Sequence, residues 1–495
     1  MMLTIFSIMT RCLGFIFKIY LTKIMTTTEL GIYNLTLSVY MVLLTIVGAS
    51  IPLTISKVTA SNIAKNNSNE TKYSITSSLI LTTLISIFLS ILVLISKPLI
   101  VLIIGDSIGY EIMLTLIPSI IFTAIYSQIR GYLWGLENYF AVSIVEFVEQ
   151  ILRIAFCIVF VNAKIVSSPI LGVGISLSIA CGLSLIYGLI LYFKNGGKFK
   201  YKKGYYKNII QSTIPLTAVR LFGSILQPII AIIIPWRLCS LGMSKDLALG
   251  ELGIAMGMTL PLLSIPSTII GAMCMILIPR INSSTDVDEQ KYQINNYLKF
   301  TITSIFVFIP IFLTLSIPLC NYVYNNYNAG LYMTECSWII IPMGLAQIST
   351  SILNALSKEN KTFIFYVISC ILMIILVLIL PNIFYVKAMM IASGISYILL
   401  TLLNIIYLKK ILKLKTALIK NLIFHALICV PVVIFNNFCY NIFISNLPLF
   451  LSIIFTGLIS AITYLALLFV FGILDINIIK TYVIKTIHKR LKKSN

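Results

Sequence analysis

Apolar stretches of about 20 residues recur along nearly the whole chain and are separated by short polar breaks. A helix of that length crosses the hydrocarbon core of a bilayer, which is about 30 Å thick. Because hydrocarbon offers the backbone no hydrogen-bond partners, each stretch must satisfy its own N–H and C=O groups, as a helix does. We therefore predict an all-α polytopic membrane protein with about fourteen transmembrane helices. The predicted spans are residues 3–24, 31–56, 75–96, 112–134, 141–163, 168–193, 209–234, 252–278, 299–320, 333–355, 362–381, 386–408, 421–444 and 449–471.

The composition excludes a soluble domain. Hydrophobic residues make up 59% of the 495 positions, charged residues only 10%, and the mean hydropathy is +1.03. A soluble domain carries about a quarter charged residues, because it must cover its core with polar surface. The net charge of +21 would suggest a nucleic-acid partner in a soluble protein, but here most charges lie in short loops. We expect no nucleic-acid partner.

The basic residues are divided unequally between alternate loops. With the N-terminus inside, the inside loops and tail hold 25 Lys and Arg, against six in the outside connections. Cationic loops resist translocation, so this asymmetry predicts a multi-pass protein of the cytoplasmic (inner) cell membrane with both termini in the cytoplasm. We interpret the basic loops mainly as topology determinants that also contact anionic membrane lipids.

A short repeat divides the chain. Glu-Leu-Gly-Ile occurs at 29–32 and again at 251–254, and Arg-x-x-Gly precedes each copy, at 11–14 and at 220–223. Because the matches fall in the same order at corresponding spans, we predict two parallel pseudo-symmetric six-helix lobes, an architecture typical of transporters. The predicted parts are an N-terminal lobe at 1–207 (helices 1–6), a C-terminal lobe at 208–420 (helices 7–12), helices 13–14 at 421–471, and a basic cytoplasmic tail at 472–495.

Ionisable residues inside spans cost about 2.5–3.5 kcal/mol near the bilayer centre, so they indicate either function or a specific partner. Arg11 and Lys18 are seven residues apart and share one face of span 1. Glu146, Glu149 and Arg153 share one face of span 5, where Glu149 and Arg153 are spaced to pair directly. The full set comprises Arg11, Lys18, Arg130, Glu146, Glu149, Arg153 and Arg220.

Cations outnumber carboxylates in this set by five to two. If Glu149 neutralises Arg153, the other cations have only Glu146 as a carboxylate partner. Cations in a membrane are tolerable where they face water or bind an anion. Since Arg offers forked donors and Lys a compact charge, we predict a hydrated central cleft that binds phosphate or pyrophosphate.

Structural interpretations stay open for several candidates. Arg130 lies near the end of span 4, where its side chain would also be stable if it reached the interface. The carboxylate–arginine pair of span 5 would equally serve as a brace within one lobe. Pro261 and Pro266 interrupt span 8 and predict either a hinge or an ordinary packing kink. Gln227, which occupies the position equivalent to Lys18 in the repeat, is a supporting candidate.

Catalytic and cofactor chemistry finds no support in the sequence. The ten Cys form no Cys-x-x-Cys motif, and the two His, His425 and His488, stand alone, so we expect neither a metal site nor a disulfide framework. No GxxxxGK[ST] nucleotide-binding loop occurs. We predict a protein that is not an enzyme and holds no cofactor, with its return step coupled to the membrane potential or to a monovalent cation.

Several runs together resemble the polysaccharide-transporter branch of the multidrug/oligosaccharidyl-lipid/polysaccharide exporter superfamily, which is MATE/MurJ-like. These runs are Arg11 through Lys18, Gly31-Ile-Tyr33, Gly48 through Pro52, Arg130-Gly131 with Glu137-Asn138, Glu149-Gln150 with Arg153, Gly257 through Pro261, Ile265-Pro266-Ser267, and Asn354-Ala-Leu with Asn360 through Phe363. The resemblance covers almost the whole chain and extends to relatives of lipid II flippases in spore-forming bacteria. It implies alternating access and a cationic substrate cleft at Arg11, Lys18, Arg153 and Arg220. From the charges and the repeat, we predict Glu146, Glu149, Arg130 and Gln227 as supporting residues.

The leading hypothesis is therefore a flippase for a polyprenyl-diphosphate-linked cell-wall precursor, which the resemblance associates with spore cortex peptidoglycan. The expected partners are this lipid-linked glycan, anionic membrane lipids and cell-wall synthases. Three alternatives stay open. A cation-coupled drug or metabolite exporter would need more intramembrane carboxylates, and an intramembrane transferase would need clustered Asp, Glu or His. A scaffold for cell-wall synthases would leave the cations in the spans unexplained.

Overall fold

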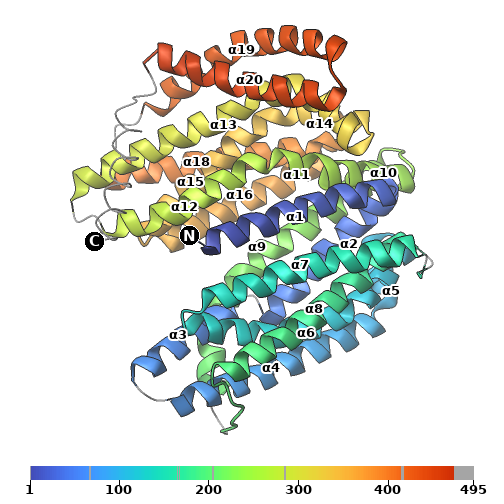
Figure 1. Cartoon of the computed structure of the whole chain (residues 1–495), viewed down its shortest axis with the longest axis vertical. Coiled ribbons are helices and arrows are strands. Elements are labelled where there is room, and N and C mark those ends of the chain that lie inside the picture. The colour runs from blue at the N-terminus through green and yellow to red at the C-terminus, as the bar shows by residue number, and fades with distance from the viewer. Residues whose placement is uncertain are drawn as a thin grey trace. The chain divides into compact units, whose positions relative to one another are not determined.

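The computed structural model describes residues 2–48, 50–65, 68–163, 165–166, 168–202, 206–283, 286–413 and 417–472. Within these residues all regular structure is helical (Figure 1). Twelve of the described helices are long and apolar enough to cross a membrane. In addition, α1 (Met2–Ile24) and α7 (Tyr139–Asn162), 23 and 24 residues long, reach the length of a span and carry the charges of predicted spans 1 and 5. The prediction of an all-α polytopic membrane protein is confirmed, and the described helices are compatible with fourteen spans.

Many polar side chains are buried inside the helical bundle beside its apolar core, and large apolar side chains cover its outer surface. Along α4 (Ser68–Ile95), Ser78 and Thr82 are fully buried, whereas Phe88 and Ile95 are 64% and 76% exposed. Gln128 of α6 (Ser107–Gly135) accepts a hydrogen bond from Ser78 Oγ at 2.8 Å and donates one to Thr82 Oγ1 at 3.2 Å. This arrangement is expected of helices that face lipid on one side and satisfy their polar groups on the other.

The chain forms two compact units. The first unit comprises Met1–Pro261 and Ile374–Met389, and the second comprises Leu262–Met373 and Met390–Asn495. Arg237 holds the later segment to the first unit, because its guanidinium donates to the Leu378 carbonyl at 3.0 Å and to Asn382 Oδ1 at 2.9 Å. The predicted lobes, 1–207 and 208–420, are defined by the sequence repeat rather than by compactness, and they stay a prediction. Besides α1, α4, α6 and α7, the first unit contains α2 (Thr27–Gly48), α3 (Ile51–Ala64), α5 (Lys97–Ile104), α8 (Pro169–Lys194), α9 (Tyr206–Ser240), α10 (Lys245–Gly253), the π-helix η1 (Ile254–Thr259) and α17 (Pro381–Phe384).

The second unit is organised around α13 (Val287–Tyr324), which packs against α14, α15, α19 and α20. His425 is buried here: its Nδ1 and the Tyr464 hydroxyl are 2.6 Å apart, and its ring stacks on Phe306 with centroids 5.5 Å apart. These contacts give His425 a packing role, and His488 lies outside the described residues. The other helices of this unit are α12 (Ile265–Ser283), α14 (Tyr327–Cys336), the 3₁₀ helix η2 (Ser337–Ile339), α15 (Ile340–Ala355), α16 (Glu359–Ile379), α18 (Lys387–Leu412), α19 (Leu418–Asn446) and α20 (Leu449–Val470). The short α11 (Leu260–Leu263) crosses the boundary between the units, and α16 and α18 each extend into the first unit.

Proline interrupts two of the predicted spans. Predicted span 31–56 is divided, because α2 ends at Gly48 and α3 begins at Ile51 with Pro52 in its first turn. Predicted span 252–278 is divided at Ser264, and Pro266 stands in the first turn of α12. Proline lacks the N–H that a continuing helix needs, but it is well accommodated in a first turn. A hinge at Pro261 and Pro266 stays a prediction, and the predicted tail at 472–495 lies outside the described residues except for Gly472.

The two copies of Glu-Leu-Gly-Ile pack against each other within the first unit, where α2 meets α10. A Cβ atom added to Gly31 would overlap the backbone carbonyl of Leu249. Reciprocally, a Cβ atom added to Gly253 would overlap the backbone carbonyl of Thr27. Only glycine permits such an approach of two backbones, so the glycine of each copy is required by the helix that begins or contains the other copy.

We expect Gly31→Ala to lower the stability of the protein, because the added methyl group must push α2 and α10 apart. Overpacking of this kind costs about 1–3 kcal/mol. The measurement is the thermal unfolding midpoint of the detergent-solubilised protein. Gly457→Ala is the matched control, since its added Cβ would lie 3.9 Å from the nearest atom, Leu315 Cδ1. Equal midpoints for the two variants would show that α2 and α10 are not in close contact.

Candidate functional site

The charged faces of predicted spans 1 and 5 meet in the first unit, because α1 packs against α7 (Figure 1). The guanidinium of Arg153 on α7 lies over the ring of Phe17 on α1, 5.0 Å from its centroid. Lys18 follows Phe17 and is close enough to Arg153 for the two positive charges to repel each other. Arg11 lies two turns earlier on α1, and the side chains of both Arg11 and Lys18 are exposed. Like charges held together in this way favour an anionic ligand.

Two buried donors on α7 have no hydrogen-bond partner among the described residues. They are Arg153 Nε and Gln150 Nε2, three residues apart on the helix face turned toward α1. Gln150 Nε2 lies 3.9 Å from the point where a Cβ would stand on Gly14, which lies between Arg11 and Lys18. A buried donor without a partner costs about 1–3 kcal/mol, so an acceptor oxygen from a ligand would be stabilised here. We call Arg11, Lys18, Gln150 and Arg153 the α1–α7 donor face.

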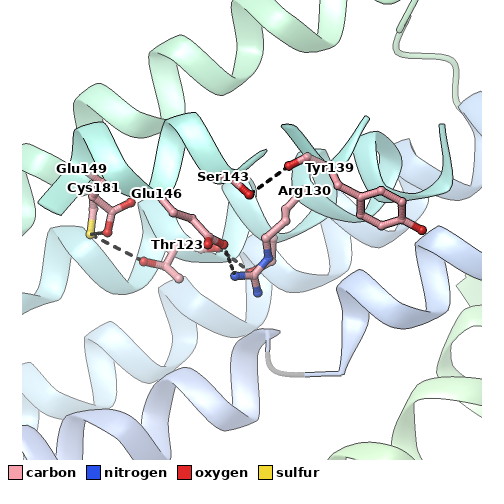
Figure 2. A network of polar contacts seen from close by, with 8 residues as sticks. Thr123, Arg130, Tyr139, Ser143, Glu146, Glu149 and Cys181 are labelled. Carbon is pink, nitrogen blue, oxygen red and sulfur yellow. Dashed lines mark hydrogen bonds and ion pairs between the residues drawn. The ribbon is translucent and has the colours of Figure 1, made fainter. Parts of the chain in front are cut away.

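Arg130 is held by two neighbours. Its Nη1 lies 3.4 Å from Glu146 Oε1 (Figure 2). Its guanidinium also lies 5.2 Å from the centroid of the Trp134 ring. The two side chains of the ion pair are 28% and 44% exposed. The pair nevertheless decides the role of Glu146, because this carboxylate serves Arg130 on α6 rather than a cation of the α1–α7 donor face.

Among the described residues, no ion pair joins Glu149 to Arg153, although the spacing on α7 predicted one. Glu149 Oε1 accepts a hydrogen bond from Cys181 Sγ of α8 at 3.8 Å. That sulfur accepts one from Thr123 Oγ1 of α6, also at 3.8 Å (Figure 2). Arg153 instead extends toward Phe17 on α1. The predicted direct pair is therefore wrong, because side chains four residues apart diverge toward different neighbouring helices.

The remaining candidates lie elsewhere in the fold. Arg220 and Gln227 are exposed and lie seven residues apart on α9, a helix that packs against α2 and α10. They belong to the same compact unit as the α1–α7 donor face but to a different helix pair. Pro261 and Pro266 lie on either side of the unit boundary at 261/262. Their functional roles stay predictions.

Gln150 is the residue that sequence reasoning missed as a candidate. The sequence contained a signal for it, since an amide in an apolar stretch, three residues before an intramembrane Arg, shares the face of that Arg. Sequence reasoning assigned Glu149 as the partner of Arg153 and therefore passed over Gln150. In the structure Glu149 contacts Cys181 of α8 instead. Within the described part of the chain, no cluster of three His, Cys, Asp or Glu residues could hold a metal ion. A function without a metal stays a prediction.

These features define a multi-pass helical membrane protein of the transporter class, with cationic residues on two packed helices of one unit. Residues 1–285 match the family described as polysaccharide biosynthesis protein, and the chain belongs to that family. Stage V sporulation protein B of Bacillus subtilis (strain 168) is 24% identical over 305 residues, which cover 59% of this chain. The match spans 58% of the length of that relative.

Two solved structures share the fold. The lipid II flippase MurJ in an inward closed conformation has a TM-score of 0.75 at 15% identity, covering 95% of this chain and 99% of MurJ. An inward-facing multidrug resistance MATE family transporter of the MOP superfamily has a TM-score of 0.70 at 12% identity, covering 82% of this chain and 94% of that transporter. At these identities the likeness establishes the fold and leaves the substrate open.

We expect Gln150→Leu to raise the thermal unfolding midpoint of the ligand-free protein, because it removes a buried donor that has no partner. The gain should correspond to about 1 kcal/mol. Gln128→Leu is the matched control: Gln128 is fully buried and bonded to Ser78 and Thr82, so this change should be destabilising. A loss of stability in Gln150→Leu as large as in Gln128→Leu would mean that the Gln150 amide already has a partner within the protein.

Proposed function

We propose that this protein is a flippase that moves a polyprenyl-diphosphate-linked cell-wall precursor, similar to lipid II, across the cytoplasmic membrane. The observation that carries the proposal is the α1–α7 donor face, where cations and unused buried donors gather inside predicted spans. A diphosphate supplies several acceptor oxygens and negative charge at one point, which matches these donors. The MurJ-like fold and the sporulation-protein relative support a lipid-linked substrate and a role in spore cortex peptidoglycan synthesis.

Each residue of the proposed site has a distinct role. Arg11 and Lys18, which are exposed on α1, attract and hold the diphosphate as it enters. Arg153 and Gln150 supply buried donors on α7 once the ligand has displaced water. Arg220, with Gln227, offers a second binding position on α9, which the diphosphate reaches as the protein changes conformation. The glycan travels through a hydrated cleft, while the polyprenyl tail stays in the bilayer.

Alternating access moves the substrate outward, and the return step is coupled to the membrane potential or to a monovalent cation. Both termini lie in the cytoplasm, where the precursor is made. Anionic lipids and cell-wall synthases are the partners that we propose, and the protein itself catalyses no reaction. The MATE-like fold keeps a cation-coupled drug exporter as an alternative. The pairing of Glu146 with Arg130 works against it, since of the two carboxylates on α7 only Glu149 is then left to meet a cationic drug.

We expect Arg11→Ala, Lys18→Ala and Arg220→Ala each to slow lipid II translocation in proteoliposomes by at least about tenfold, because each removes a charged hydrogen bond to the diphosphate. The measurement is the initial rate at which fluorescent lipid II becomes accessible in the opposite leaflet, at matched amounts of folded protein. Lys23→Ala is the control, because Lys23 is also an exposed lysine of α1 but stands in its last turn.

Two results would change the proposal. Equal activity of all variants and the wild type would exclude these residues as the substrate site. A wild type that does not move lipid II but moves another polyprenyl-diphosphate glycan would retain the mechanism and change the sugar.

A further inference from the structure

The segment 194–202, which begins at the last residue of α8, has the sequence Lys-Asn-Gly-Gly-Lys-Phe-Lys-Tyr-Lys, and we call it the basic–aromatic loop. A loop that only determines topology needs positive charge but no defined shape. This loop has a defined shape from its first residues. Gly196 adopts a left-handed φ of +79°, and the N–H of Gly197 donates to the carbonyl of Tyr192 at 2.9 Å. The chain therefore turns sharply where the helix ends.

Contacts with α4 and α8 hold the rest of the loop in place. The Tyr192 hydroxyl donates to the carbonyl of Lys198 at 3.1 Å, and the ring of Phe199 stacks on Tyr192 with centroids 5.1 Å apart. The backbone N–H of Lys200 donates to Thr76 Oγ1 of α4 at 3.0 Å. Tyr192 is itself fully buried, so the loop is fixed to the core of the first unit and not only to its surface.

The lysines of the loop contact neutral groups rather than carboxylates among the described residues. None of Lys198, Lys200 and Lys202 forms an ion pair with a described carboxylate. Lys200 Nζ donates to Asn69 Oδ1 at 3.1 Å, and Lys202 Nζ lies 5.7 Å from the centroid of the Tyr73 ring. These neutral partners orient the ammonium groups without neutralising them, so the charges remain free to meet an anion.

The loop lies where the apolar outer surface of the bundle ends. Ile186 and Ile190 on the outer face of α8 are 56% and 46% exposed, and the loop begins four residues after Ile190. Three aromatic side chains, Phe193, Phe199 and Tyr201, are also exposed beside the lysines. Aromatic rings and long cationic side chains are the groups that favour the boundary between hydrocarbon and lipid headgroups.

We propose that the basic–aromatic loop is a preformed docking surface for the phosphate headgroups of anionic phospholipids. The lysines contact the phosphates, and Phe193 and Tyr201 lie at the level of the glycerol backbone. Because the loop is already fixed, lipid binding requires little additional ordering of the chain. This surface is separate from the α1–α7 donor face and holds boundary lipid rather than the transported substrate.

The test is native mass spectrometry of the full-length protein in detergent, titrated separately with dioleoylphosphatidylglycerol, dioleoylphosphatidylcholine or undecaprenyl diphosphate. Two triple variants that lose the same charge are compared: Lys198→Gln with Lys200→Gln and Lys202→Gln in the loop, and Lys409→Gln with Lys410→Gln and Lys413→Gln at the end of α18. A lysine near an anionic surface contributes a factor of about five in affinity, so the loop variant should lose at least about tenfold for phosphatidylglycerol and the control less than about twofold. Neither variant should change the weak binding of phosphatidylcholine.

A further variant tests the fixed shape separately from the charge. Thr76→Val removes the acceptor for the Lys200 N–H and leaves every lysine in place. It should weaken phosphatidylglycerol binding by about two- to threefold, since the loop must then be ordered by the lipid. Size-exclusion elution and thermal unfolding confirm that each variant is folded.

Three outcomes would overturn the proposal. Equal losses in the loop variant and the α18 control would mean that net charge alone attracts the lipid. Unchanged phosphatidylglycerol affinity in the loop variant would leave the loop as a topology determinant only. A loss confined to added undecaprenyl diphosphate, with phosphatidylglycerol affinity unchanged, would make the loop a capture point for the substrate.

Discussion

Hydrocarbon offers neither hydrogen bonds nor solvation for charge, and the arrangement of this protein follows from that constraint. The backbone satisfies itself in helices, and the polar side chains turn inward. On α4 the buried residues Ser78 and Thr82 bind Gln128 of α6, while Phe88 and Ile95 face outward. In the second unit, the hydrogen bond between His425 and Tyr464 joins α19 to α20 in the same way. Polar contacts between helices thus add to a buried apolar core, which in the first unit includes Ile55, Ile129 and Leu133.

Charge is the costly exception, and its placement separates structural residues from candidate functional ones. Glu146 and Arg130 neutralise each other, and Glu149 is hydrogen-bonded within the α6–α7–α8 bundle. Arg153 has an aromatic ring beneath its guanidinium, a like charge nearby and an Nε without a described partner. A protein that needed only a stable bundle would gain by replacing such a group with an apolar one. Its retention beside Lys18 and Gln150 is explained if an anion completes the site.

Sequence reasoning succeeded where a single helix determines the answer. The face shared by Arg11 and Lys18 and the length of each span follow from helix geometry alone. It failed at the pairing of Glu149 with Arg153. Sequence reasoning identified the Glu-Leu-Gly-Ile repeat. It did not predict that Gly31 and Gly253 each approach the other's helix, because a repeat shows that two segments are equivalent and does not show that they touch.

The sequence by itself determined the class of protein, the approximate spans, the family and the residues that cannot lie in hydrocarbon without a reason. These properties depend on composition, on local periodicity and on short motifs, all of which can be read from the linear sequence. Only the tertiary structure decided which partner each charged residue has, and it alone showed that Gln150 faces Gly14 with an unused donor. The physical reason is that helical spacing fixes which residues share a face, whereas the neighbouring helix that covers this face is chosen by packing across the whole unit.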